Sequence, residues 1–409
     1  EVLRGPQGTL YGSNAIGGTV RIITNKPNFD DLEVFGATVV GDETNRPGTE
    51  SRLYAGVNVP ISDNVAARVI GSYGSRDGKI MNTFTGTTGK EKDDFVRAQL
   101  AFQPADDWLI NLTYINDHTE SSGYEYADRS QPGYYYEAIL TENPEATYGY
   151  DVSLDFPDCP AGSERTQCRS GGPIAGNHDP KFMVWETLDQ WSDNEYSVFS
   201  INVQKDDVFG IGDLSYAASF QEYEHASLDN WSRLDAEDMF RTWIINDDGY
   251  DRTSHELRLQ SNSDGPLQWT VGAFFDEVDW KQTPDGQWQY HASDNRSRAI
   301  AEYFWGYWFG YGVDPTQMGI DMYGDGTKNY NYNQIEIVDE ERAFFGEASY
   351  TFALDNGHSF ELTAGIRNYD LDSISHTEVS GIWIGDEPIE DNLSGSEDGN
   401  RYKFSASWM

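Results

Sequence analysis

Apolar and polar residues alternate in short runs along most of this chain. The clearest run spans residues 52–61, where one face carries Leu53, Ala55, Val57, Val59 and Ile61. A period of two residues is typical of a β-strand whose two faces meet different surroundings. Similar runs predict about twelve strands, at residues 32–40, 52–61, 65–69, 96–102, 110–114, 195–204, 213–223, 253–261, 267–278, 343–352, 359–370 and 401–408.

The connections between these strands alternate between short and long. Short turns are predicted near residues 60–64, 104–107, 205–212, 262–266 and 354–357. Long loops are predicted at 42–50, 77–91, 119–193, 224–250, 282–336 and 372–398. In an antiparallel meander this order places every short turn at one end of the sheet, which is the layout of outer-membrane β-barrels. A soluble antiparallel sheet with one face on a core gives the same alternation and remains the alternative.

Composition narrows the class of protein. Aromatic residues make up 14% of the chain and there are 40 glycines, which favours strands and turns over helices. The net charge of −41 makes nucleic acid a poor partner. Such an acidic surface could also bind divalent cations or suit a saline medium. Mean hydropathy is −0.65, and no run of 18 apolar residues predicts a membrane helix.

The chain has two cysteines, Cys159 and Cys168, within one long polar loop. Such a pair predicts a loop disulfide in an oxidising compartment, with two free thiols as the alternative. A zinc site is disfavoured because the nearest histidine, His178, lies outside the usual ligand spacing.

The first 27 residues carry an ordered glycine-rich motif. It consists of Arg4, Gly5 and Pro6, then Leu10, Tyr11 and Gly12, then Ala15, Gly17, Gly18 and a short strand that ends at Thr24. A phosphate-binding loop is excluded because no helix and no Gly-Lys-Ser/Thr sequence follow. The motif closely resembles the end of the plug domain in TonB-dependent outer-membrane receptors. Weaker resemblance extends through the later strands, for example at Ser254–Leu259 and Gly365–Arg367.

This resemblance implies an architecture and a location. Residues 1–30 would be the C-terminal end of a plug domain, and residues 31–409 the N-terminal part of a transmembrane antiparallel up-and-down β-barrel. Family barrels have about 22 strands, so the twelve predicted here would be a partial barrel in the bacterial outer membrane, with long loops outside the cell. We therefore expect further plug elements before this segment and further strands after it.

The resemblance also implies a receptor and not an enzyme, with no cofactor. It predicts energy-coupled uptake of a scarce nutrient, most of all a ferric siderophore, with carbohydrate or cobalamin as alternatives. The implied partners are the TonB complex, outer-membrane lipid and lipopolysaccharide, and a small extracellular ligand. A secreted soluble carbohydrate-binding β protein is the alternative class, and a passive porin would share the strands without the plug motif.

Three groups of residues are candidate sites. By resemblance, the plug arginine Arg4 is predicted to pair with a barrel glutamate, Glu256 or Glu347, although these glutamates could simply line a wet lumen. Acidic segments at Asp247–Asp251 and Asp321–Asp325 could hold calcium, but neither matches an EF-hand loop. Aromatic side chains in two long loops are predicted to contact ligand or to pack as a lid, namely Tyr124, Tyr126, Tyr134, Tyr135, Tyr136, Tyr303, Trp305, Tyr307 and Trp308.

Overall fold

The structure is a computed structural model of the 409 residues. It describes residues 2–4, 18–20, 23–42, 48–78, 80–82, 87–123, 168–169, 172–173, 183–184, 189–230, 242–282, 287–290, 329–354, 358–380 and 388–408.

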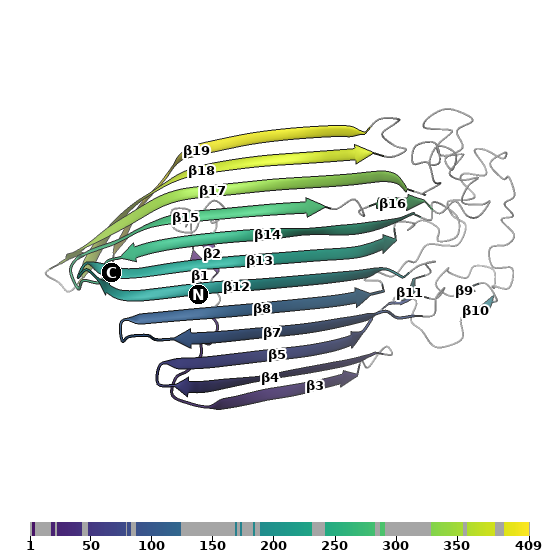
Figure 1. Ribbon diagram of the computed structural model, residues 1–409, viewed down its shortest axis with the longest axis horizontal. Helices are drawn as coiled ribbons and strands as arrows, with labels where there is room; N and C mark the ends of the chain where they lie inside the picture. The colour runs from purple at the N-terminus through teal and green to yellow at the C-terminus, as the bar shows by residue number, and fades with distance from the viewer. Residues whose placement is uncertain are drawn as a thin grey trace.

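One large antiparallel sheet dominates the described residues (Figure 1). Its path contains twelve strands, each hydrogen-bonded to the next along the chain. They are β3 (Glu33–Asp42), β4 (Thr49–Ser62), β5 (Val65–Asp77), β7 (Lys90–Phe102), β8 (Trp108–Ser122), β12 (Trp191–Val208), β13 (Gly212–Asn230), β14 (Thr242–Gln260), β15 (Leu267–Gln282), β17 (Asn329–Ala353), β18 (Ser359–Ser380) and β19 (Ile389–Trp408). This confirms the predicted all-β class and the partial up-and-down sheet.

Shorter strands complete the described structure. The small β16 (Gln287–Tyr290) pairs with both β14 and β17. β6 (Met81–Asn82) pairs with β11 (Met183–Val184), and β9 (Cys168–Arg169) with β10 (Gly172–Pro173). Near the N-terminus, β1 (Val2–Arg4) pairs with β2 (Gly18–Val20), so that Arg4 lies opposite Gly18. This pair forms a sheet of its own within the predicted plug segment.

No helix among the described residues is long and apolar enough to cross a membrane.

The predicted strand bounds were too short. The loop predicted at 372–398 is largely strand, because β18 continues to Ser380 and β19 begins at Ile389. β17 likewise begins at Asn329, although its alternation of apolar residues is clear only from residue 343. The backbone ladder continues where the side chains on both faces become polar, so hydropathy alone marks only the part of each strand beside the apolar surface.

Exposure alternates residue by residue and separates two faces of the sheet. On β17, Phe344 is 68% exposed whereas its neighbour Phe345 is 4% exposed. On β18, Ile366 is 45% exposed and Arg367 is 1% exposed. The exposed face carries large apolar side chains on strand after strand, among them Phe199, Phe220, Leu257, Val271, Phe344, Leu362 and Ile366. We call this the outer face, and the opposite, largely polar face the inner face.

Glycines on the inner face let side chains reach across a strand. Gly272 lies opposite Phe345 on one side and Arg258 on the other. The Phe345 ring covers Gly272, so that a Cβ on Gly272 would lie 2.4 Å from the ring Cζ. This position brings Phe345 under the Arg258 guanidinium, 5.4 Å from the ring centre. A larger residue at 272 would separate the two side chains.

Gly272→Val should therefore destabilise the intact protein by about 1–3 kcal/mol, because Phe345 would have to leave its position over the strand. Gly395→Val is the matched control, since a Cβ at Gly395 meets nothing within 4 Å. Thermal unfolding in detergent measures both variants. Equal stability of Gly272→Val and wild type would show that the ring does not depend on this glycine.

Candidate functional site

The predicted barrel glutamates Glu256 and Glu347 both lie on the inner face. Arg258 Nη2 donates a 2.9 Å hydrogen bond to Glu256 Oε2 on the same strand. Lys403 Nζ donates at 2.9 Å to Glu347 Oε2, across the intervening Gly365 of β18. Each glutamate thus has a cation on the wall itself, which the sequence analysis did not anticipate. The side chain of Arg4 lies outside the described residues, so its pairing with Glu256 or Glu347 stays a prediction.

Arg367 is the most deeply buried charged side chain of the described inner wall. Its Nη2 donates a 2.6 Å hydrogen bond to Glu341 Oε1. The guanidinium also lies over two aromatic rings, 5.1 Å from the centre of Phe274 and 5.8 Å from that of Phe345. Together with Arg258, Arg367 brackets Phe345 between two cations. This part of the wall is therefore a charge-paired surface.

Replacing Arg367 by Met should cost the intact protein about 3–5 kcal/mol, because Glu341 would keep its charge in a partly buried position without its cation. Arg367→Met combined with Glu341→Gln should recover most of that loss. Denaturant unfolding of wild type, both single variants and the double variant measures the coupling. If the second substitution restores no stability, the ion pair is not what holds Arg367 in place.

A second inner-face cluster lies toward the long-loop ends of β12, β13 and β14. The Tyr223 hydroxyl donates to Asn194 Oδ1 at 3.0 Å, and His225 Nδ1 lies 2.7 Å from the same oxygen. The Tyr196 hydroxyl donates to Gln221 at 3.0 Å, and the rings of Tyr223 and Tyr250 are centred 5.4 Å apart. Burial raises the pKa of the Tyr196 and Tyr223 hydroxyls, so both remain protonated donors. The cluster offers aromatic faces together with phenol, amide and imidazole groups, and the carboxyl of Asp248 lies opposite His225 on the same face.

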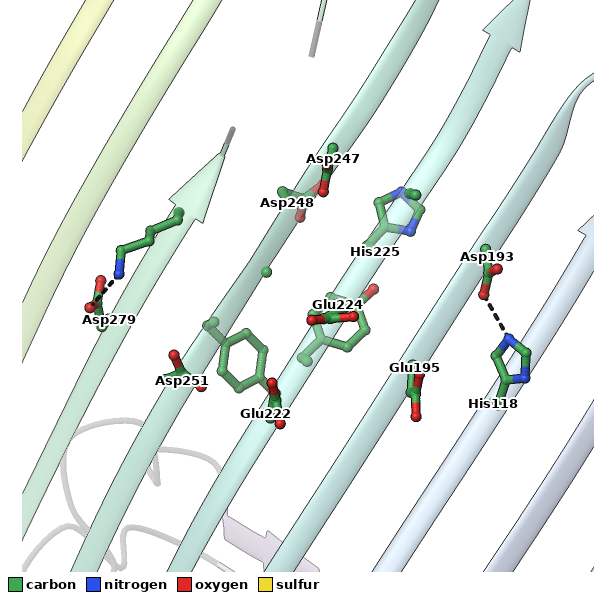
Figure 2. A pocket seen from close by; sticks show the side chains of 15 residues that line it. His118, Asp193, Glu195, Glu222, Glu224, His225, Asp247, Asp248, Asp251 and Asp279 are labelled. Carbon is green, nitrogen blue, oxygen red and sulfur yellow. Dashed lines mark hydrogen bonds and ion pairs between the residues drawn. The ribbon is translucent and has the colours of Figure 1, made fainter. Parts of the chain in front are cut away.

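An acidic hollow of 680 Å³ lies on the other face of the same strands (Figure 2). Its floor includes Gly249 and Ala226, whose small size opens the space. Most of the side chains around it alternate in step with Phe199 and Phe220, which places them on the outer face just beyond the apolar residues. Its lining also includes four residues at inner-face positions, namely Tyr223, His225, Asp248 and Tyr250. Eight carboxyl groups line it. Seven belong to outer-face positions, namely Asp193, Glu195, Glu222, Glu224, Asp247, Asp251 and Asp279, and the eighth, Asp248, lies at an inner-face position opposite His225.

The hollow gathers part of the acidic segment that the sequence analysis singled out. Asp247, Asp248 and Asp251 all line it. Burial raises the pKa of Asp248, an effect that nearby His225 opposes. Lys281 Nζ donates a 2.9 Å hydrogen bond to Asp279 at one edge. Calcium binding at 247–251 stays a prediction, and Asp321–Asp325 lies outside the described residues.

His118 joins β8 to its neighbours at the other edge of the hollow. Its Nε2 lies 2.8 Å from Asp193 Oδ1 on β12, and its Nδ1 lies 3.4 Å from Asp94 Oδ1 on β7. His118, Glu120 and Asp193 are close enough together to hold a metal ion. However, Lys92 Nζ already donates to Glu120 at 2.6 Å. The hydrogen bond to Asp193 also raises the pKa of His118, which favours a bound proton. Ion pairs, and not a metal ion, therefore explain why His118, Glu120 and Asp193 lie close together.

The pairing should make stability depend on pH. Because the folded-state pKa of His118 is raised, its contribution is full below the unfolded-state value of about 6.5 and is lost as pH rises through the higher folded-state pKa. The difference in melting temperature between wild type and His118→Gln should shrink from about pH 6 to about pH 9. Thermal unfolding across this range measures it, with His376→Gln as control. A constant difference would mean that His118 is not charged in the folded protein.

Comparison with known proteins connects this geometry to a family. No family model matches the chain. An iron-regulated outer membrane virulence protein of Vibrio cholerae is 39% identical over 77 residues, which is 19% of this chain and 12% of that protein. A probable TonB-dependent siderophore receptor, PirA, of Acinetobacter baumannii is 31% identical over 120 residues, covering 27% and 16% of the two chains.

A solved structure matches almost the whole fold. The ferric yersiniabactin uptake receptor FyuA of Yersinia pestis superposes with a TM-score of 0.63 over 99% of this chain, at 15% identity. The chain is similar in sequence and in fold to TonB-dependent outer-membrane receptors. The resemblance drawn from the plug motif and the outer-membrane location are thereby confirmed. The chain covers 48% of the FyuA receptor's length.

Several predicted residues of this receptor-like chain cannot be placed. The loop aromatics Tyr124, Tyr126, Tyr134, Tyr135, Tyr136, Tyr303, Trp305, Tyr307 and Trp308 lie outside the described residues. So do the plug-motif positions Gly5, Pro6, Leu10, Tyr11, Gly12, Ala15 and Gly17, and the side chains of Cys159 and Cys168. The inner-face tyrosines were missed because their stretches were read as loop or as ordinary strand. Tyr196, Tyr223 and Tyr250 each occupy inner-face positions, a signal that becomes readable only once strand pairing is known.

Proposed function

We propose that this chain is part of a TonB-dependent receptor that takes up a ferric siderophore, and that it is not an enzyme. The fold match across the chain is the main support. The relatives' names add to it, since one is called iron-regulated, one a probable siderophore receptor and one a ferric yersiniabactin uptake receptor. Because the chain spans about half of the FyuA receptor, this activity would belong to the whole protein.

In this proposal residues 1–30 end the plug and residues 31–409 form the first part of the barrel. The paired strands β1 and β2 would be plug elements, held against a wall on which Glu256, Glu347 and Arg367 are each charge-paired. Pulling by the TonB complex on a plug segment would then move the plug past a wall that does not rearrange. A wall with few unpaired charges would present low electrostatic resistance to that motion.

Ligand contact is proposed at the inner-face cluster of Tyr196, Tyr223 and Tyr250. These side chains lie toward the long loops, where a ligand from outside would first enter the lumen. Neutral phenol groups and their aromatic faces suit catecholate, phenolate or other planar ligand groups. The carboxylates at the same level of the outer face make a strongly anionic ligand unfavourable near this rim.

Tyr223→Ala should weaken ligand binding by about tenfold or more, because it removes one aromatic face and a hydrogen-bond donor. Tyr114→Ala is the matched control, since Tyr114 lies on the outer face away from the lumen. Binding of labelled ferric siderophores to iron-starved cells measures the effect. An equal loss of siderophore binding in both variants would indicate a general folding defect and not the loss of a ligand contact at Tyr223.

An iron-uptake assay tests whether the whole protein belongs to the proposed class of TonB-dependent transporters. The intact receptor should restore growth of a siderophore-receptor-deficient strain on limiting iron only when TonB is present. Uptake that persists without TonB would identify a passive pore. Active uptake of a sugar or of cobalamin in place of iron would retain the transporter and correct the substrate.

A further inference from the structure

A buried asparagine on β4 holds the chain segment that leads into the first barrel strand. Asn58 is fully buried on the inner face. Its Oδ1 accepts a 2.8 Å hydrogen bond from the backbone N–H of Asn28. Its Nδ2 donates to the carbonyl oxygens of Asn28 at 2.9 Å and of Asp31 at 2.8 Å. One side-chain amide thus serves the backbone of a segment that belongs to no strand and has no ladder partner there.

The neighbouring inner-face positions fix the residues that follow. Arg68 lies opposite Asn58 on β5 and is 5% exposed. Its Nη1 donates a 2.9 Å hydrogen bond to Glu33 Oε2, and its guanidinium lies 4.8 Å from the centre of the Phe35 ring. The Phe35 ring covers Gly56, where a Cβ would lie 2.4 Å from the ring Cζ. The first residues of β3 are therefore held by the same part of the wall.

Burial marks the point at which the chain meets the wall. Residues 23–26 are exposed, whereas Pro27 is buried. Asn28 Oδ1 accepts a 2.8 Å hydrogen bond from the Asp30 N–H, which bends the chain just beyond this point. The contact lies at the short-turn end of the sheet, where β3 begins (Figure 1). With the long loops outside the cell, this end faces the periplasm.

We propose that Asn58 is a positioning residue that anchors the junction between plug and barrel and limits how far the plug can be drawn out. The proposal rests on the proposed function, in which the TonB complex pulls on the plug from the periplasm. Without Asn58 the chain from Asn28 to Glu33 would come free of the wall, and extended chain of that length spans about 17 Å. With Asn58 in place this slack is withheld, so a pull moves the plug against a fixed end at Asn28.

Amide hydrogen exchange of the intact receptor in detergent tests the anchor directly. Asn58→Leu keeps the volume of the side chain but removes its hydrogen bonds, and should speed exchange at residues 28–32 by at least about tenfold. Asn58→Ala should do the same, and serves if the leucine variant does not fold. Asn111→Leu is the matched control, because Asn111 is a buried inner-face asparagine on β8, which pairs with neither β4 nor β5. Its exchange at residues 28–32 should equal that of wild type.

Permeability in cells tests whether the anchor limits plug movement. Asn58→Leu should bind siderophore as wild type does, but it should admit a large hydrophilic antibiotic that wild-type cells exclude. This sensitivity should appear only when TonB is present, because pulling is what draws out the released chain. A defect in folding or plug seating alone would admit the antibiotic with or without TonB.

Three results would overturn the proposal. Exchange at residues 28–32 could be unchanged in both Asn58 variants, or Asn111→Leu could speed it equally. Antibiotic sensitivity could also be absent, or independent of TonB, in a variant whose junction exchanges faster. The exchange measurement needs neither TonB nor siderophore, so it separates this proposal from the proposed function. A wild type that takes up no siderophore, but whose junction loses protection in Asn58→Leu, would contradict the proposed substrate and support the anchor.

Discussion

The fold depends on a continuous antiparallel hydrogen-bond ladder. From β3 to β19 each strand pairs with its neighbours, and the register shifts only near turns and at the short β16. Without water, backbone groups of a membrane-spanning strand must find their partners on adjacent strands. The ladder meets this need, and it also assigns every side chain to one of two faces, because successive residues point in opposite directions. The apolar surface of the outer face, the charge-paired wall of the inner face and the acidic hollow all follow from that assignment.

The two faces deal with charge in different ways. On the inner face, several buried or half-buried cations are paired with a single carboxylate each, as Arg367 is with Glu341 and Lys403 with Glu347. Glycines such as Gly365 permit these pairs by leaving room for side chains to cross a strand. Beyond the apolar surface of the outer face, carboxylates crowd together with few cations among them. Water and salt can screen such a group, since charges further apart than about 8–10 Å interact weakly at physiological ionic strength.

Much of the fold was predictable from the sequence and much of the site was not. The alternation at Leu53–Ile61 or Leu267–Phe275 predicts strands because one face meets lipid and the other does not. Alternation fails where both faces are polar, so hydropathy alone predicts loop for the outer parts of β17, β18 and β19. The partners of Glu256 and Glu347 were missed for a related reason. Lys403 lies 56 residues from Glu347 along the chain, and only the register of β17, β18 and β19 brings the two together.

The register also explains why the tyrosine cluster and most of the carboxylates of the acidic hollow lie on opposite faces of the same strands. Tyr223 and Glu224 are adjacent in sequence and therefore point to opposite faces. Within β13, each step of two residues carries the inner face from Gln221 to Tyr223 to His225, while the outer face carries Glu222, Glu224 and Ala226. A single stretch of strand thus presents amide, phenol and imidazole groups to the lumen and carboxylates to the outside. Because most of these carboxylates project away from the lumen, the exterior of this stretch is acidic while Tyr196, Tyr223 and Tyr250 face inward, with Asp248 as an inner-face carboxyl beside them.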